Sequence, residues 1–367
     1  MRQVFRFLGW WLLLVNLFAL VVVNRLDLMP DKAFPWINPW ETQQLHSWNP
    51  ISLHARWDSI WLLELAKHGY HWEGGTRLTN LNFPPLYPFL MRIVAPLTAG
   101  NYILAGWIVS VLCLAGALAV FYRLVQEFHP EIDPQQPIFY LLIFPASFAL
   151  NAVYAESLFL LLSLLTIYFA LKGRFVVSGI FGGLAALTRI NGILLFVPAA
   201  WEYFRRHGRA GLTRRSVAGL FLIPLGTFLF FLHHYFFSGN FFLYMKIQSR
   251  FGRQLFRITP EHFVVFSHPA VANLLTDVTV LVFLVGVTWL IFKRGWTSYG
   301  LYLVASLFLI VATGTLVGIA RYSLVLFPIF IALASIKSHQ FERAYTLGSV
   351  LLMGLSITLF VNWYWGM

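Results

Sequence analysis

One acidic side chain lies in an aromatic-rich segment that could carry chemistry at a membrane face. Residues 56–70 read RWDSIWLLELAKHGY, and residues 83–89 read FPPLYPF. An ionised side chain costs on the order of a few kcal/mol to hold beside lipid, so membrane proteins keep such groups where they act. We therefore expect a reaction centre around Asp58, at the membrane face.

Three further positions carry polar groups in apolar surroundings. Glu156 begins an apolar run, Arg189 lies within the apolar stretch 175–204, and Arg321 precedes Tyr322 after another apolar run. The planar guanidinium group matches the oxygens of a phosphate, so the two arginines indicate phosphate binding. The alternatives are a carboxylate at a helix start near the headgroups for Glu156 and snorkelling to the interface for Arg189.

The composition identifies an integral membrane protein. Of 367 residues, 59% are hydrophobic and only 11% are charged, whereas soluble domains carry about 25% charged residues. The net charge of +12 comes from arginines scattered between apolar runs, which indicates cytoplasmic loops and anionic lipid rather than nucleic acid. Cys113 is the only cysteine, so the chain cannot form an internal disulfide or a thiolate metal site.

The apolar runs predict an all-α, polytopic protein with about eleven transmembrane helices in a single domain, residues 1–367. The region 175–204 has basic residues at both ends, so it should cross out and back with its outer turn at Thr188–Gly192. Two shorter spans are expected between Pro137 and Leu171. The clearer spans are Phe7–Val23, Tyr102–Val125, Val217–Phe237, Val278–Phe292, Tyr299–Ala320, Tyr322–Ile336 and Ala344–Val361.

The basic short loops all fall on the side of the N-terminus, which predicts a cytoplasmic start and an uncleaved first helix. Residues 24–101 then form the first extracytoplasmic loop, and an outer turn is expected at Arg321. Within the first loop, Trp57, Trp61 and Leu65 recur at helical spacing, which predicts an interfacial helix ended by Gly69. Asp58 would lie in its first turn, where the helix dipole favours the ionised carboxylate.

The segments 56–70 and 83–89 resemble the first-loop signature of the PIG-V mannosyltransferases and their bacterial relatives. Further similarity runs through residues 144–165, 182–199 and 320–330, and it covers most of the chain. The resemblance implies a GT-C type glycosyltransferase that takes a sugar from a polyprenyl-phosphate donor on the outer face of the cell membrane. The later segments match the eukaryotic enzyme less well, so its glycosylphosphatidylinositol acceptor is not carried over.

The resemblance also places the catalytic carboxylate in the first outer loop, at Asp58. In a direct, inverting displacement at the anomeric carbon, one carboxylate takes the proton of the attacking hydroxyl. Cationic groups stabilise the charge that develops on the departing phosphate. We therefore expect Asp58 as the base, close to Arg189 and Arg321 on the donor phosphate, with a lipid or glycan as acceptor. Mannose as the donor sugar rests on the resemblance alone.

Arg56, Glu156 and Tyr322 are expected to contact substrate as well. Glu156 could orient the acceptor, position Arg56, or share a divalent cation with Asp58. Two carboxylates alone do not define a metal site, so the sequence leaves a divalent cation open. The alternative for Asp58 is a solvated loop acid, or a helix cap partnered by Arg56.

Other polar groups have structural explanations. A basic quartet has spacings of four, three and four residues, which predicts one helical face resting on anionic headgroups; it comprises Lys246, Arg250, Arg253 and Arg257. The histidines at 54, 68, 71, 233 and 234 lack a completing carboxylate or cysteine, which favours hydrogen bonding over zinc. Gly182 and Gly183 indicate close helix packing.

Two rival functions remain from the sequence. A flippase or transporter of lipid-linked sugars would show repeated halves and a midplane site, whereas here the polar residues crowd one face without a visible repeat. An oligosaccharide ligase or polymerase would also need an outer site with arginines. The mass of the product, one hexose or a whole block, discriminates between transfer and ligation.

Overall fold

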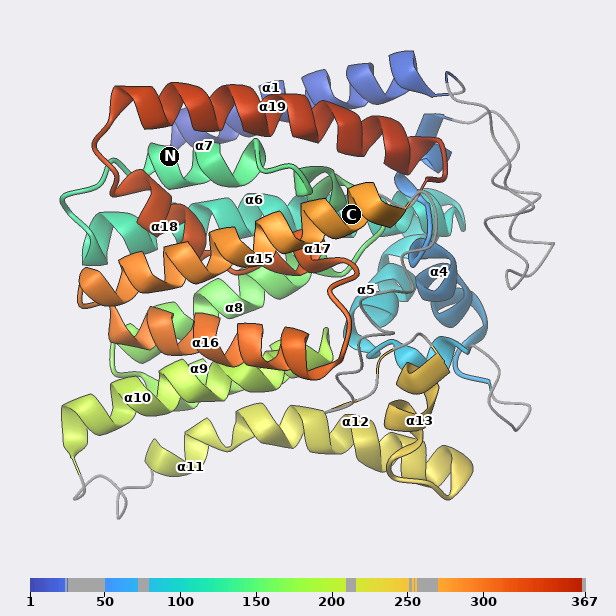
Figure 1. The fold of residues 1–367 in the computed structure, drawn as a ribbon. Coiled ribbons are helices and arrows are strands. Elements are labelled where there is room, and N and C mark those ends of the chain that lie inside the picture. The colour runs from blue at the N-terminus through green and yellow to red at the C-terminus, as the bar shows by residue number, and fades with distance from the viewer. Residues whose placement is uncertain are drawn as a thin grey trace. The chain divides into compact units, whose positions relative to one another are not determined.

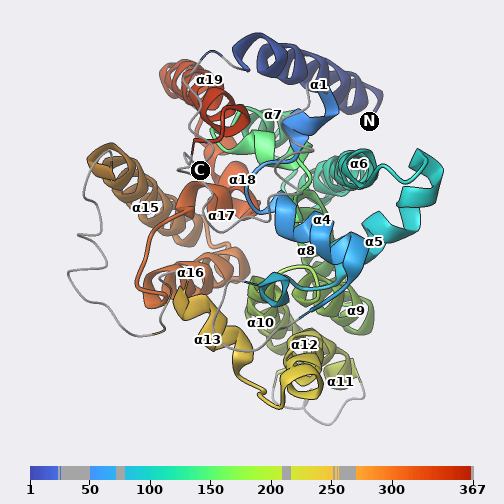
Figure 2. The same cartoon turned by 90° about the vertical axis from the view of Figure 1, so that its right-hand side faces the viewer.

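The computed structural model describes residues 1–23, 25, 50–71, 79–208, 216–250, 253, 255 and 270–364, without the side chains of residues 250 and 270–275. Over these ranges the chain is helical and contains no strand, as predicted (Figures 1 and 2). The α-helices are α1 (Arg2–Val22), α4 (Ser59–His68), α5 (Leu86–Val94), α6 (Tyr102–Phe128), α7 (Gln135–Leu142), α8 (Glu156–Leu171), α9 (Phe175–Ala186), α10 (Phe196–His207), α11 (Ser216–Leu220), α12 (Leu222–Ser238), α13 (Leu243–Arg250), α15 (Ala270–Lys293), α16 (Thr297–Ala312), α17 (Ile319–Leu324), α18 (Pro328–Ala334) and α19 (His339–Val361). Short 3-10 helices are η1 (Pro50–His54), η2 (Asn80–Asn82), η3 (Ala95–Thr98), η4 (Ser147–Asn151) and η5 (Ile190–Leu195).

Several helices are suited to a bilayer. In the described part of the chain, α1, α6, α15 and α19 are long and apolar enough to cross a membrane, and the bent pair α12–α13 could form a fifth span. Helices α8, α9 and α16 are apolar but shorter. The region 137–150, expected to form a span, instead contains the eight-residue α7 followed by turns, because Pro145 cannot continue a helix. The number of eleven crossings therefore remains a prediction.

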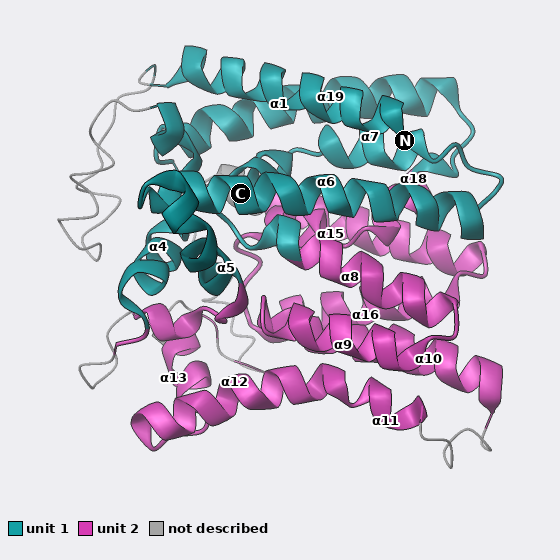
Figure 3. Cartoon of the chain, turned by 180° about the vertical axis from the view of Figure 1, so that it is seen from behind, with its two compact units in different colours: residues 1–69, 87–158, 334–367 teal, residues 70–86, 159–333 magenta. Residues whose placement is uncertain are grey.

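The chain folds into two compact units (Figure 3). Unit 1 comprises residues 1–69, 87–158 and 334–367, and unit 2 comprises residues 70–86 and 159–333. The prediction of a single domain over residues 1–367 is not tested by this division.

Unit 1 is built on α1, α6 and α19. Helix α1 buries one face, at spacings of three and four residues, and exposes apolar side chains on the other, as expected for a helix at a lipid boundary. It runs beside α19 (Figures 1 and 2). The side chains of Asn101 and Ser338 cap α6 and α19 by accepting amide hydrogen bonds at 3.0 and 3.3 Å, which is the role these residue types favour.

Unit 2 contains a glycine-dependent packing of α9 against α11 and α12. A Cβ atom added at Gly179 would collide with the carbonyl oxygen of Gly219, and one at Gly183 with that of Leu222. Small residues allow helix backbones to approach this closely within a membrane. The packing role predicted for Gly182 and Gly183 is confirmed, because Gly182 lies against Ile223 of α12.

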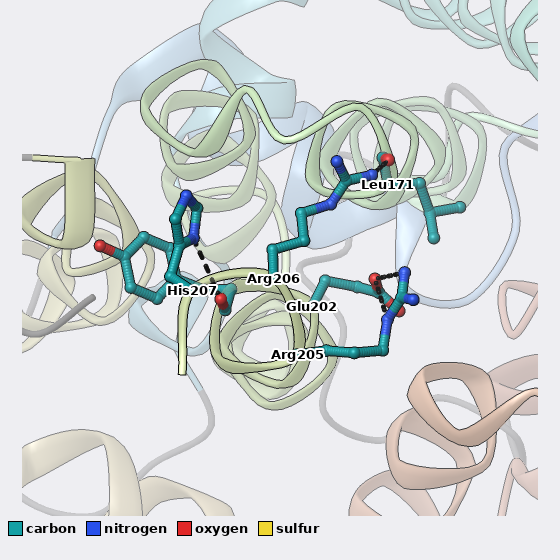
Figure 4. A network of polar contacts seen from close by, with 6 residues as sticks. Leu171, Glu202, Arg205, Arg206 and His207 are labelled. Carbon is teal, nitrogen blue, oxygen red and sulfur yellow. Dashed lines mark hydrogen bonds and ion pairs between the residues drawn. The ribbon is translucent and has the colours of Figure 1, made fainter. Parts of the chain in front are cut away.

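The last turn of α10 carries basic side chains that tie unit 2 together at one end (Figure 4). Arg205 donates to the buried carboxylate of Glu202, with an Nη2–Oε2 distance of 2.6 Å. Arg206 donates to the carbonyl of Leu171, the last residue of α8. Cationic groups at a helix C-terminus also complement its dipole.

Adding a side chain where α9 and α11 pack closely should destabilise the protein. We expect Gly179→Ala to lower the free energy of unfolding by about 1–3 kcal/mol, because the added methyl group meets backbone that cannot rotate away. The measurement is thermal unfolding of the detergent-solubilised protein. Gly286→Ala, in α15 with open space around its Cβ position, is the matched control and should be neutral or stabilising by up to about 1 kcal/mol. Equal melting temperatures for the two variants would contradict this packing.

Candidate active site

The Asp58 loop, residues 50–58, leads directly into α4 in unit 1. Asp58 is the N-cap residue of α4, is partly exposed, and makes no capping hydrogen bond with its side chain. The helix ends where predicted, at Gly69, whose φ of +80° is one that glycine adopts without strain. Trp61 and Leu65 are only 8% and 5% exposed, because α4 packs on α6; the position of α4 at the membrane interface remains a prediction.

Arg56, two residues before Asp58, is 3% exposed and is held from several directions. Its guanidinium carbon lies 4.6 Å from the centroid of the Trp363 ring. Burial lowers the pKa of Arg56 to about 9, which still leaves it cationic near neutral pH. Its Nε and one Nη donate to the backbone carbonyl oxygens of Ser52, Ala55 and Val361. These contacts indicate a positioning role for Arg56; its direct contact with substrate remains a prediction.

Glu156 is the first residue of α8 and is 2% exposed. The turn before it is attached to the Asp58 loop, because the amide of Val153 donates to the carbonyl of His54 at 2.8 Å. His54 Nδ1 also lies 2.7 Å from the carbonyl oxygen of Asn151. The loop that carries Asp58 and the turn that carries Glu156 are therefore joined by two hydrogen bonds within unit 1.

A polar network supports this junction. The side-chain oxygen of Asn151 accepts from the indole of Trp107 at 2.9 Å, and its nitrogen donates to Asn16 at 2.8 Å. His54 stacks on the ring of Phe148, with centroids 6.1 Å apart. Burial of His54 lowers its pKa to about 4. The imidazole is therefore neutral near pH 7 and can donate its Nδ1–H to the Asn151 carbonyl.

In unit 2, three arginines surround one tyrosine. We call this the Tyr322 cluster; it comprises Arg189, Arg253, Arg321 and Tyr322. The guanidinium carbons of Arg189, Arg253 and Arg321 lie 5.4, 5.3 and 5.8 Å from the centroid of the Tyr322 ring. Arg253 also donates to the Tyr322 hydroxyl. Cations at such distances are attracted by the negative face of an aromatic ring.

The elements that carry Arg189 and Arg321 agree in part with the sequence analysis. The predicted turn at Thr188–Gly192 is confirmed, and Arg189 is the extended residue that caps η5. The outer turn expected at Arg321 is wrong, because the chain turns at residues 313–318. Gly314 and Gly318 there have φ of +77° and +82°, which favour glycine. Arg321 itself lies inside α17 and is 5% exposed.

Arg253 was not recognised as a site residue from the sequence, and the predicted basic helical face is wrong. Helix α13 ends at Arg250, so Arg253 lies beyond it. Gln248 of α13 donates to the side chain of Asn82 in η2 at 2.8 Å, which fixes this helix end within unit 2. Arg257 lies outside the described residues. The one sequence signal for this cluster was the pair Arg321–Tyr322, an arginine next to a tyrosine; it did not indicate Arg253.

Three of the histidines singled out above, His54, His71 and His234, have hydrogen-bond partners. His71 Nδ1 lies 3.2 Å from Asn80 Nδ2, and His234 Nε2 lies 2.9 Å from the carbonyl oxygen of Leu81. Across the described residues, no three histidine, cysteine or acidic side chains are grouped so that they could hold a metal ion.

Asp58, Arg56 and Glu156 thus belong to unit 1, and the Tyr322 cluster belongs to unit 2. The expected proximity of Asp58 to Arg189 and Arg321 spans both units and remains a prediction.

Comparison with known proteins shows the family of the chain. The family profile described as Mannosyltransferase (PIG-V) matches residues 12–210, which is more than half of the chain. The protein belongs to this family. The matched range includes Asp58, Glu156 and Arg189, and it ends before Arg321. A search of curated proteins gave no significant match.

One solved structure shares the fold at low sequence identity, and a second shows a weaker likeness. ArnT from Cupriavidus metallidurans, solved bound to undecaprenyl phosphate, superposes with a TM-score of 0.52 and 12% identity over 98% of this chain and 77% of ArnT. The apo oligosaccharyltransferase of Archaeoglobus fulgidus gives a TM-score of 0.48 and 15% identity over 98% of this chain and 56% of that enzyme. The likeness to ArnT concerns the fold, which is that of GT-C enzymes. Together with the family match, it identifies the protein as a multi-pass membrane glycosyltransferase.

The neutral state of His54 should make stability depend on pH. The unfolded histidine binds a proton near pH 6.5, whereas the folded one does so only near pH 4. The stabilisation is therefore complete above pH 6.5 and is lost as the pH falls toward 4, by on the order of 3 kcal/mol.

The measurement compares melting temperatures of the wild type and His54→Asn between pH 7.5 and 4.5. The asparagine amide can replace the Nδ1 donor to Asn151 but cannot take up a proton. Carboxylates titrate alike in both proteins, so the wild type should lose more stability than the variant below pH 6.5. Parallel pH curves would show that His54 is not held neutral in the fold.

Proposed function

We propose that the protein transfers a single hexose, mannose, from a polyprenyl-phosphate sugar to an acceptor hydroxyl on the extracytoplasmic face of the cell membrane. The observation that carries this proposal is Asp58, a partly exposed carboxylate at the start of α4 that is not used to cap the helix. The family match and the ligand of ArnT, undecaprenyl phosphate, support a lipid-linked donor.

Asp58 acts as the general base. As the acceptor oxygen forms its bond to the anomeric carbon, the acceptor proton passes to the Asp58 carboxylate. The bond from the anomeric carbon to the phosphate oxygen breaks at the same time, and the polyprenyl phosphate leaves with the electron pair. A phosphate leaves readily, so no general acid is needed, unlike in glycoside hydrolysis. A single displacement inverts the anomeric configuration.

The Tyr322 cluster binds the donor phosphate. Three guanidinium groups around one ring repel one another, and an anion between them lowers that repulsion while accepting their N–H donors. Their positive charge also stabilises the charge that grows on the departing phosphate. Arg189 and Arg321 take the role expected of them, and Arg253 joins them. The ring and hydroxyl of Tyr322 hold these side chains apart in a fixed arrangement.

Glu156 orients the acceptor. Its carboxylate is held by the hydrogen-bonded turn that joins η4 and α8 to the Asp58 loop. A buried carboxylate there can accept a hydrogen bond from a sugar or lipid hydroxyl. Such orientation lowers the entropy that the reaction must lose on reaching the transition state.

The reaction is tested by incubating the purified protein with several polyprenyl-phosphate sugars and membrane lipid extract, followed by mass analysis of the product. The proposal expects an added mass of one hexose with the mannose donor. Addition of a whole oligosaccharide block would identify a ligase, and uptake of the donor into vesicles without any new glycan would identify a transporter.

Replacing the base should abolish transfer. We expect Asp58→Asn to lower the rate of product formation by about 10²-fold to 10⁴-fold, because the amide cannot accept the proton. Glu131→Gln is the control; this acid is half exposed beside His129 at the far end of α6, and its variant should keep wild-type activity. Wild-type turnover by Asp58→Asn would reject the assignment of the base.

Removing an arginine of the Tyr322 cluster should weaken binding of the donor. We expect Arg189→Gln and Arg253→Gln to raise the KM for the polyprenyl-phosphate sugar about tenfold or more, because each removes a charge-assisted hydrogen bond worth roughly 1.5–3 kcal/mol. Steady-state kinetics at varied donor concentration provide the measurement. Arg205→Gln, which alters the α10 network of Figure 4, is the control. An unchanged KM in both cluster variants would contradict phosphate binding at this place.

A further inference from the structure

The end of α19 contacts the Asp58 loop, although the contacting residues are 305 positions apart in the sequence. The carbonyl oxygen of Val361 accepts a hydrogen bond from Arg56 Nε at 3.1 Å. The Trp363 ring lies 4.6 Å from the Arg56 guanidinium carbon, and its centroid lies 6.5 Å from that of Trp57. Asp58 directly follows Trp57 in the chain.

The end of α19 is itself well fixed within unit 1. Asn362 is 1% exposed, and its amide nitrogen donates to the carbonyl of Val22 in α1 at 2.9 Å. Phe360 packs edge-on against Phe148 and Tyr154, with centroids 5.4 and 5.8 Å apart. A side chain anchored to this helix end is therefore held in place with respect to α1 and η4.

Trp57 and Trp363 also share an uncommon backbone conformation with positive φ. Trp57 and Trp363 have φ of +53° and +66°, and the only other described residue besides glycine with positive φ is Ala99. This region favours glycine, and a bulky side chain there is strained. Strained residues persist where surrounding contacts hold them, and they often lie at functional sites. Here both strained residues belong to one contact, and it adjoins Asp58.

We propose that Trp363 is a positioning residue for sugar transfer. Together with the Val361 carbonyl it holds Arg56 and Trp57, and thereby sets the direction of the Asp58 carboxylate. A displacement of the base by about 1 Å can cost on the order of 10²-fold in rate, so a rigid anchor is useful. We call Arg56, Trp57 and Trp363 the indole clamp. The inference rests on the proposed function, because it gives Asp58 the role of base.

The test uses Trp363→Ala and Trp363→Phe in the full-length purified protein, with Tyr364→Ala as the matched control. Tyr364 is the next aromatic residue and is 40% exposed. The first readout is kinetic, per folded molecule, with polyprenyl-phosphate mannose and membrane lipid extract. We expect kcat of Trp363→Ala to fall about 10-fold to 10²-fold with an unchanged donor KM. Trp363→Phe should recover most of the rate, because a phenyl ring still faces the guanidinium group.

The second readout is amide hydrogen exchange without substrate, which does not depend on activity. The amides of Ser59 and Ile60 donate to the carbonyls of Arg56 and Trp57 at 3.1 Å each. In Trp363→Ala these two amides should exchange about tenfold faster, while those of α6 stay as in the wild type. Tyr364→Ala should match the wild type in both readouts.

Each result decides the inference. A wild-type kcat per folded Trp363→Ala molecule, or unchanged exchange at Ser59 and Ile60, overturns the positioning role. A rise in donor KM with unchanged kcat also overturns it, because Trp363 would then serve donor binding. If Asp58→Asn transfers sugar normally while the exchange result holds, the assignment of Asp58 as the base fails instead, and the positioning role falls with it, because the clamp is then only a contact of the fold.

Discussion

Buried or half-buried guanidinium groups must find other groups that replace lost hydration, and the surroundings of Arg56 in unit 1 and of the Tyr322 cluster in unit 2 each follow from this constraint. The chain has 26 basic residues against 14 acidic ones, so the carboxylates are too few to pair with every basic side chain. Arg56 is surrounded by backbone carbonyls and an indole, and Arg189, Arg253 and Arg321 share the ring of Tyr322. Aromatic faces and carbonyl oxygens attract a cation without neutralising it.

Neutral side chains contribute to the rigidity of the Asp58 loop, in addition to the cationic Arg56. His54 is buried uncharged and joins the loop to the turn before Glu156, while Asn151 connects that turn to α1 and α6. Hydrogen bonds between neutral groups cost less desolvation than ion pairs in a low-dielectric interior. The glycine-lined contact of α9 with α11 and α12 performs the corresponding task in unit 2, because it fixes the helix that leads into Arg189.

The sequence predicted features that depend on local patterns. A helix that ends at Gly69 and the turn at Thr188–Gly192 are confirmed, because each is decided by a few neighbouring residues. The helix begins at Ser59, so Trp57 lies before it and Asp58 is its N-cap rather than a residue of its first turn. Features that depend on distant contacts were missed. Nothing near Arg253 indicates that it reaches Tyr322, nor near Trp363 that it reaches Arg56, since those contacts join segments far apart in the chain. Arg321 was expected at a turn, because an arginine after an apolar run usually marks an end; instead α17 buries it within the Tyr322 cluster.

The proposed mechanism requires that a lipid phosphate bound by the arginines of the Tyr322 cluster lie beside Asp58, and this proximity is a prediction. An experimental structure of the protein with polyprenyl phosphate tests it most directly. The account predicts phosphate oxygens within hydrogen-bonding distance of the Arg189 and Arg321 guanidinium groups, about 2.7–2.9 Å, with the Asp58 carboxylate directed to the space beside the phosphate. A phosphate bound instead at Arg205 and Arg206, or an Asp58 carboxylate turned away from the bound phosphate, would contradict it.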